Sequence, residues 1–263
     1  MKYHIDTIPI WDAFKAAGEC PLCDIYNKCE SEFVERSLGG SVMEPDTRVQ
    51  VNKQGFCGEH LSQLYAQQNR LGLALMMHSH IKEIIAELDK QEKELAVQME
   101  IDSKKRGLER AARAVTKSAP SVAMTHDIAA IARTRIDDCY ICSRLKSTMD
   151  RYVKTVVAMW ENEKEFQKAF RGSKGFCLKH YSQLLDAGAS CLMGAKHREF
   201  TSALVGAQRE NIARIEKELE WFTLKFDYRN KDKPWGGSRD AVERTLLKLR
   251  SWQGPAGQKK KEE

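Results

Sequence analysis

The sequence contains no apolar run that approaches the ~18 residues of a membrane-spanning helix, which argues against a membrane protein. Strand patterns are nearly absent, because the run Arg48-Val49-Gln50-Val51 is too short to predict one. Residues 1–14 carry Asp6 and Asp12 inside their apolar stretch, so we expect no secretory leader. Eight cysteines without an export signal indicate metal binding or redox chemistry in a cytoplasmic protein rather than a disulfide scaffold.

Charge is spread unevenly along the 263 residues, although the overall composition, 42% hydrophobic and 30% charged, is that of a chain with a buried core. Residues 1–103 carry a net charge of −7, residues 104–117 of +5 and residues 118–263 of +8. The simplest interpretation is that these charged residues lie on the solvent-exposed sides of helices. Nucleic-acid binding through 104–117 and the basic second half is a weaker alternative, because no aromatic residues are interleaved with the basic ones.

An internal repeat organises the chain. The ten residues Gly55–Leu64, which read GFCGEHLSQL, recur as Gly175–Leu184, which read GFCLKHYSQL. A Cys-x-x-Cys pair lies upstream of each copy. The offset between copies is 119 residues for the pairs and 120 for the later motif, which predicts a tandem duplication of one CxxC…CxxH pattern.

The residues that recur are those that bind metals, whereas Cys29 and Cys191 are not duplicated. The predicted ligands are Cys20, Cys23, Cys57, His60, Cys139, Cys142, Cys177 and His180. Three cysteines and one histidine form a common tetrahedral zinc site, so we expect two zinc ions per chain. All four half-motifs are predicted at the start of a helix, and Gly55 and Gly175 would supply flexible entries. Because both quartets are complete, we expect structural sites and no enzyme.

Two other chemistries use the same residues. The Cys20–Cys23 pair alone would suit thioredoxin-like redox exchange, but the required βαβ pattern is absent. An iron–sulfur cluster could also take Cys and His ligands. Coordination within each half is the simpler arrangement, since the spacers of 33 and 34 residues can fold back as helical hairpins. Exchange of ligands between the halves stays open.

Helical periodicity dominates the rest, and we expect an all-α fold of two tandem helical modules, each with a long C-terminal helix. The modules would be residues 1–117 and 122–252, with a linker at 118–121 around Pro120 and a disordered tail at 253–263. The expected helices are 9–17, 24–37, 143–161 and a last one from Ser238 to Leu249. In addition, one helical stretch of up to roughly 40 residues is expected after each of the two GFCxxH motifs. The modules would pack through these long helices.

Several short motifs together resemble an uncharacterised bacterial family, seen mostly in Firmicutes, with tandem Cys-rich units. They are Met43-Glu44-Pro45-Asp46, both GFCxxH copies, Asp227-Tyr228-Arg229 and Lys233-Pro234-Trp235-Gly236. The resemblance covers almost the whole chain. It implies a bacterial cytoplasmic protein of unknown function and supplies no reaction.

The predicted function is therefore a non-catalytic zinc protein with a protein-interaction or scaffold role. Its partner would be another protein or a second copy, bound through the long helices or the polar, aromatic loop 227–236. That loop is more simply a segment that pins the last helix. The main alternative is a metal- or redox-responsive regulator, in which Cys29 or Cys191 acts as a resolving thiol.

Overall fold

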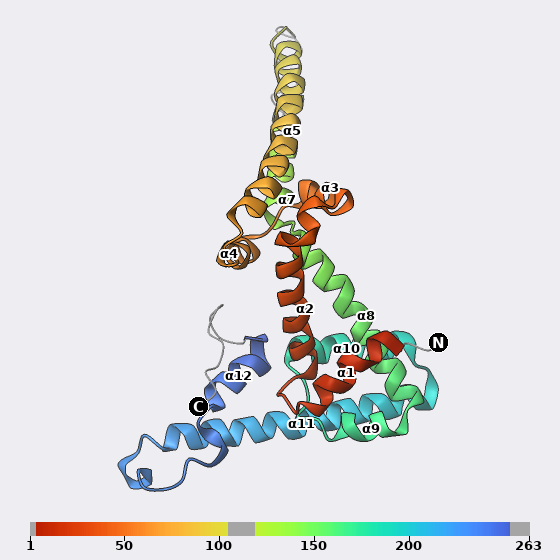
Figure 1. Ribbon diagram of the computed structural model, residues 1–263, viewed down its shortest axis with the longest axis vertical. Helices are drawn as coiled ribbons and strands as arrows, with labels where there is room; N and C mark the ends of the chain where they lie inside the picture. The colour runs from red at the N-terminus through yellow and green to blue at the C-terminus, as the bar shows by residue number, and fades with distance from the viewer. Residues whose placement is uncertain (1–3, 105–118, 253–263) are drawn as a thin grey trace. The chain divides into compact units, whose positions relative to one another are not determined.

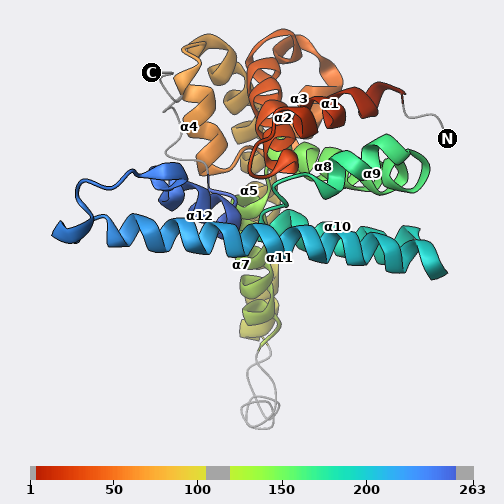
Figure 2. The same cartoon turned by 90° about the horizontal axis from the view of Figure 1, so that it is seen from below.

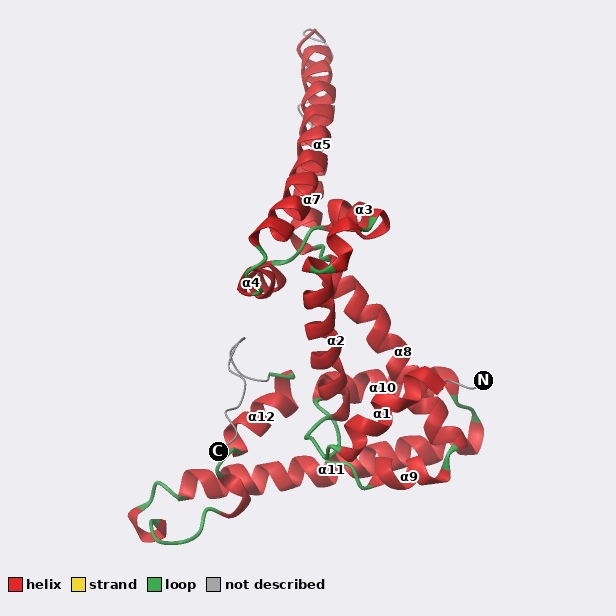
Figure 3. Cartoon of the chain, in the orientation of Figure 1, coloured by secondary structure: helices red, strands yellow, loops and turns green. Residues whose placement is uncertain are grey.

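The computed structural model describes residues 4–104 and 119–252, and these form eleven α-helices and three 3-10 helices (Figures 1 and 2). No strand occurs within these ranges, so the all-α prediction is confirmed (Figure 3). None of the described helices combines the length and apolarity needed to cross a bilayer. The tail 253–263, Ser118 of the linker and all of the basic run 104–117 except Lys104 lie outside the described residues.

The helices form two compact units that do not follow the two halves of the sequence. Unit 1 takes the chain up to Glu30 and from Leu145 onward, and unit 2 is Ser31–Arg144. The chain passes between them within α2 (Pro21–Leu38) and returns within α8 (Tyr140–Asn162). Each unit therefore combines parts of both expected modules, 1–117 and 122–252.

Unit 1 is built on an aromatic core. Besides the first part of α2 and most of α8 it contains α1 (His4–Lys15), α9 (Lys164–Arg171), α10 (Leu178–Cys191), α11 (Gly194–Leu224), η2 (Tyr228–Asn230), η3 (Gly236–Ser238) and α12 (Ala241–Arg250). Phe14, Phe166, Phe170 and Phe176 are buried in mutual ring contact, and Trp160 meets Phe200 edge-on. Burying these rings removes a large apolar area from water and so stabilises the unit.

Unit 2 has an aliphatic core and a long helical hairpin. Its further elements are η1 (Gly40–Met43), α3 (Pro45–Gln54), α4 (Gly58–Ala66), α5 (Arg70–Lys104) and α7 (Pro120–Asp137). Val51, Leu64 and Met76 are fully buried between α3, α4 and α5. Helices α5 and α7 run side by side and antiparallel (Figures 1 and 2).

Some expected elements differ from those observed. Both long stretches are interrupted, at residues 67–69 and 192–193, so each GFCxxH motif begins a short helix that precedes the long one. Ser238 was expected to cap the last helix, but it lies in η3 and Asp240 takes the cap position. Pro120 begins α7, since proline is well tolerated in the first turn of a helix. The apolar run at 48–51 lies within α3.

Candidate metal centres

The eight predicted ligands gather into two groups, each of three cysteines and one histidine. Cluster 1, in unit 1, contains Cys20, Cys23, Cys177 and His180, and cluster 2, in unit 2, contains Cys57, His60, Cys139 and Cys142. Each cluster joins the CxxC pair of one half to the CxxH motif of the other. The ligands are thus exchanged between the halves of the duplication, contrary to the simpler within-half arrangement.

Helix lengths explain why the within-half arrangement fails. A hairpin that returned the chain to its own CxxC pair would need two legs of similar length. In the first half, α2 has 18 residues and the following α3 has only 10. In the second half, α8 has 23 residues and α9 has 8. At 1.5 Å per residue the return helix is shorter than the outgoing helix by more than about 10 Å in both halves, so the helices by themselves do not bring the chain back to its own CxxC pair.

Cluster 1 is closed to solvent. The Sγ atoms of Cys20 and Cys23 each lie 3.4 Å from Nδ1 of His180, and that of Cys177 lies 3.2 Å from it. The Sγ atoms of Cys23 and Cys177 are 3.5 Å apart. All four residues are buried, with at most 1% of their surface exposed.

Cluster 2 has the same arrangement but is more open. Nδ1 of His60 lies 3.2 Å from Sγ of Cys57, 3.3 Å from that of Cys139 and 3.4 Å from that of Cys142. The Sγ atoms of Cys57 and Cys142 are 3.9 Å apart. His60 and Cys139 are buried, whereas Cys57 is half-buried and Cys142 is exposed. Solvent and thiol reagents can therefore reach cluster 2 more easily than cluster 1.

The separations fit a tetrahedral metal ion. Zinc–sulfur bonds of ~2.3 Å and zinc–nitrogen bonds of ~2.0 Å place ligand atoms about 3.5–3.8 Å apart at tetrahedral angles. In each cluster all four ligand atoms lie within 4.8 Å of one another. The Sγ–Sγ distances of 3.5 and 3.9 Å are far beyond the ~2.05 Å of a disulfide, and all eight cysteines are free. Each cluster could therefore hold one metal ion through four protein ligands.

Local backbone structure positions these ligands in the same way in both clusters. Cys57 and Cys177 are the N-caps of α4 and α10, and the amide of His180 donates to Sγ of Cys177 at 3.4 Å. Cys20 and Cys139 immediately precede α2 and α8. Free amides and the helix dipole favour thiolates at these four helix starts, as the sequence predicted.

The turns before these motifs require glycine. Gly55 and Gly175 have φ of 64° and 71°, a region that residues with a side chain rarely adopt. A Cβ at Gly55 would lie 2.7 Å from Nε2 of His80, and one at Gly175 would lie 3.1 Å from Oε1 of Gln208. Gln208 is also hydrogen-bonded to both backbone groups of Phe176, which fixes the entry to cluster 1.

The pKa values of the thiols within a cluster shift in opposite directions, because one thiolate that is stabilised by hydrogen bonds disfavours a second negative charge beside it. Burial raises the pKa of Cys20 to about 12, and the hydrogen bond with Cys177 raises that of Cys23. Hydrogen bonds from Cys20 and Cys23 lower the pKa of Cys177. Without a cation, cluster 1 therefore keeps protons on Cys20 and Cys23.

Cluster 2 follows the same rule. Burial raises the pKa of Cys139, but hydrogen bonds from His60 and from backbone amides outweigh it and bring that pKa to about 6. Burial, followed by the negative charge of Cys139, raises the pKa of Cys142. A divalent metal would stabilise all three thiolates together.

Helix α12 and its C-cap support cluster 1 with residues that no sequence pattern indicated. The hydroxyl of Ser251 donates to Sγ of Cys177 at 3.1 Å. The ammonium of Lys248, whose residue is 1% exposed, donates to the carbonyls of Glu19 (2.5 Å) and Lys174. Burial lowers the pKa of Lys248, and the negative charge of Glu19 opposes that shift. Because Glu19 precedes Cys20 and Lys174 lies three residues before Cys177, Lys248 connects the two chain segments that carry the ligands.

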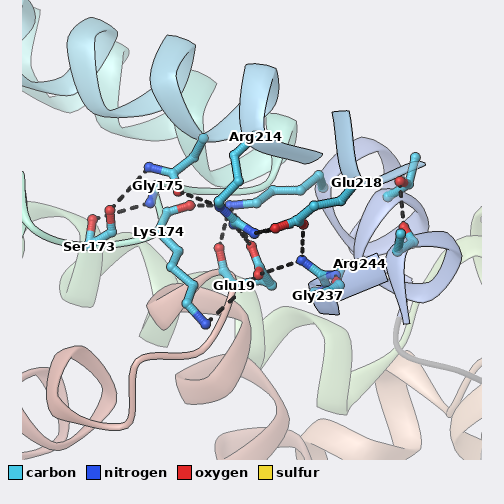
Figure 4. Close-up of polar contacts among 12 residues, drawn as sticks. Glu19, Ser173, Lys174, Gly175, Arg214, Glu218, Gly237 and Arg244 are labelled. Carbon is cyan, nitrogen blue, oxygen red and sulfur yellow. Dashed lines mark hydrogen bonds and ion pairs between the residues drawn. The ribbon is translucent and has the colours of Figure 1, made fainter. Parts of the chain in front are cut away.

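A buried carboxylate completes this support. Glu19 accepts from Arg214 at 2.6 Å and lies 3.7 Å from Arg244 (Figure 4). It also lies 3.5 Å from the ammonium of Lys248. Glu218 joins Arg214 and Arg244 from α11 (Figure 4). The network links α11 and α12 to the loop before Cys20. Lysine is usually a surface residue. The supporting role of Lys248 could therefore not be predicted from the sequence and is seen only from its buried position on α12.

The remaining candidates lie outside both clusters. Cys29 is buried and Cys191 is exposed, and neither belongs to a cluster. His80 donates through Nδ1 to the carbonyl of Asn52 at 2.8 Å, as expected of a structural histidine. Loop 227–236 packs on α11, since Trp235 contacts Phe222 and the ammonium of Lys225 donates to three of the loop's carbonyls.

Comparison with known proteins places the chain in a family without giving an activity. A family model described as "Family of unknown function (DUF6062)" matches residues 1–255, so the chain belongs to that family. No curated protein and no solved structure matches the chain.

Proposed function

We propose that this member of the DUF6062 family is a non-catalytic zinc protein whose two structural Cys3His sites hold its helical units in shape for binding a protein partner. The observation that carries the proposal is the convergence of three sulfurs and one imidazole nitrogen in each cluster, at distances that suit tetrahedral zinc. Four protein ligands leave no coordination position for a substrate. Such sites contribute folding free energy directly, on the order of 10 kcal/mol in small zinc peptides.

The interaction role is supported by the long helices. Helix α5 has 35 residues and α11 has 31, and both expose large hydrophobic side chains. An extended helix with apolar side chains in solvent is a common surface for docking another helix.

Elemental analysis of the full chain, purified without added metal and without air, tests the metal assignment. We expect two zinc ions per chain and an unfolding temperature that falls when a chelator is added. Iron with inorganic sulfide would overturn the proposal and indicate an iron–sulfur protein. No bound metal, together with unchanged stability in chelator, would overturn it as well.

A metal- or redox-responsive regulator is the second candidate, and the exposure of Cys142 favours it. In that case cluster 2 would release its metal upon oxidation while cluster 1 kept it. Peroxide treatment of the metal-loaded protein distinguishes the two: release of one metal ion per chain, reversed by a reductant, supports the regulator. Retention of both ions supports purely structural sites. Nucleic-acid binding, the third candidate, predicts an affinity that falls steeply with salt, and no binding at low salt would dismiss it.

A further inference from the structure

The hairpin of α5 and α7 has a defined register. The carboxylate of Asp102 accepts from the amide of Ser121 at 3.0 Å, and Glu87 pairs with Arg135 at 2.7 Å. These two contacts place the helices antiparallel along most of α7 (Figures 1 and 2). The residues of α5 that face α7, such as Ile84, are half-buried.

A second apolar stripe on α5 has no partner among the described residues. Its members are Ile81, Ile85, Leu88 and Met99, which return to one side of the helix and are interrupted by Glu92, whereas Leu95 is half-buried like Ile84. All four expose about half of their surface, 52% for Ile81, 51% for Ile85, 52% for Leu88 and 52% for Met99. At about 100° per residue this stripe is turned about 90° from the seam that faces α7.

Helix α7 carries a matching stripe at intervals of seven, consisting of Val122, Ala129 and Ile136. Val122 is 44% exposed and Ile136 is 73% exposed. This stripe is turned about 100° from the α5-facing side of α7, in the same rotational sense as the stripe on α5. In antiparallel helices the same sense of rotation brings both stripes to one face of the hairpin. Helix α3 packs against the base of the hairpin on the other side of α5, where Arg48 donates to Ser79 at 2.8 Å.

The outer edge of α5 lies beside the apolar face and remote from α7. Its charged residues are complementary to the same residues of a second, antiparallel copy of α5. Lys82, Asp89, Lys93 and Glu100 follow one another there, are exposed and alternate in sign. If a second α5 lies antiparallel about a two-fold axis at Gln91, Lys82 meets Glu100 and Asp89 meets Lys93, each pair occurring twice. A two-fold interface requires such self-complementarity.

We propose that this hairpin face is a homodimer interface in which two copies pack antiparallel, α5 against α5, into a four-helix bundle. The inference rests on the proposed interaction function and names its partner as a second copy of this chain. Packing the two faces would bury the apolar side chains of both hairpins, which a single hairpin leaves in water, while the Glu92 carboxylate of each copy, close to the axis, has to turn to the solvent at the rim. The paired edge charges would set the antiparallel register.

Sedimentation of the full, metal-loaded chain tests the interface. We expect twice the chain mass of 30.0 kDa at micromolar concentration. Leu88→Glu should raise the dimer dissociation constant at least a hundredfold and yield monomer. Val97→Glu is the matched control, because Val97 is 61% exposed on α5 but lies away from the stripe. A monomeric parent chain, or a dimer that Leu88→Glu leaves intact, would overturn the proposal.

Charge reversal tests the register. Asp89→Lys places a lysine opposite Lys93 of the second copy. It should raise the dimer dissociation constant about threefold to tenfold, since exposed ion pairs are individually weak. Adding Lys93→Asp to it should restore the affinity, and failure of that rescue would overturn the antiparallel pairing. Metal content is measured in every variant. Two metals per chain in a monomeric protein would refute the interface alone, whereas a metal-free dimer would refute the proposed metal sites alone.

Discussion

Lys248 shows how a single buried charge supports cluster 1. Its ammonium donates to the carbonyls of Glu19 and Lys174, so both ligand-bearing loops depend on one side chain. Lys248→Met keeps the volume but leaves both carbonyls without this donor, which should lower the free energy of unfolding by about 1–3 kcal/mol. Denaturant unfolding checks this, with Lys217→Met at an exposed position of α11 as the control. Equal stability of the two variants would show that Lys248 is dispensable.

The thiols of cluster 1 make metal binding depend on pH. Because Cys20 has a pKa of about 12 and that of Cys23 is also raised, both keep their protons at neutral pH until a metal displaces them. Affinity should therefore rise with pH, by up to about a hundredfold per unit where two protons are displaced. Zinc titration at pH 6.5 and 7.5 with a competing chelator, together with proton release in weak buffer, measures this. A pH-independent affinity would contradict the assigned protonation.

At the scale of the element, the turn that leads into each CxxH helix depends on glycine. Gly175→Ala would place a Cβ at φ of 71° against Oε1 of Gln208, so we expect a loss of about 1–2 kcal/mol and weaker metal binding at cluster 1. Gly206→Ala, in open space within α11, should instead stabilise the protein by about 0.5–1 kcal/mol. Thermal unfolding of both variants gives the comparison. Stabilisation by both would refute the requirement at Gly175.

Helix starts could be predicted from the sequence more reliably than helix ends or faces. The duplicated motifs located all four helix starts that carry ligands, because ligand spacing and helix capping act within a few residues. The short helices α3 and α9 were not expected, since neither has a long apolar period. The apolar positions expected on α12, Val242, Leu246 and Leu249, are 37%, 38% and 49% exposed, while Lys248 is buried. Tertiary partners, which the local pattern does not contain, decide which side of a helix is buried.

At the scale of the whole molecule, the sequence indicated the eight candidate ligands but not their grouping. The spacers of 33 and 34 residues are equally compatible with coordination within each half and with exchange between halves. The choice depends on whether the chain folds back after each CxxC pair. Because α2 and α8 continue for 18 and 23 residues, it does not, and each CxxC pair joins the CxxH motif of the other half.

Metal stoichiometry of two matched quadruple variants tests this exchange most directly. The first, Cys20→Ser/Cys23→Ser/Cys177→Ser/His180→Ala, removes every ligand of cluster 1, and we predict one metal ion per chain, held by the intact cluster 2. The second, Cys20→Ser/Cys23→Ser/Cys57→Ser/His60→Ala, leaves only two ligands in each cluster, and we predict none. The reverse result, with no metal in the first variant and one in the second, would show that each half coordinates its own metal and would contradict the account.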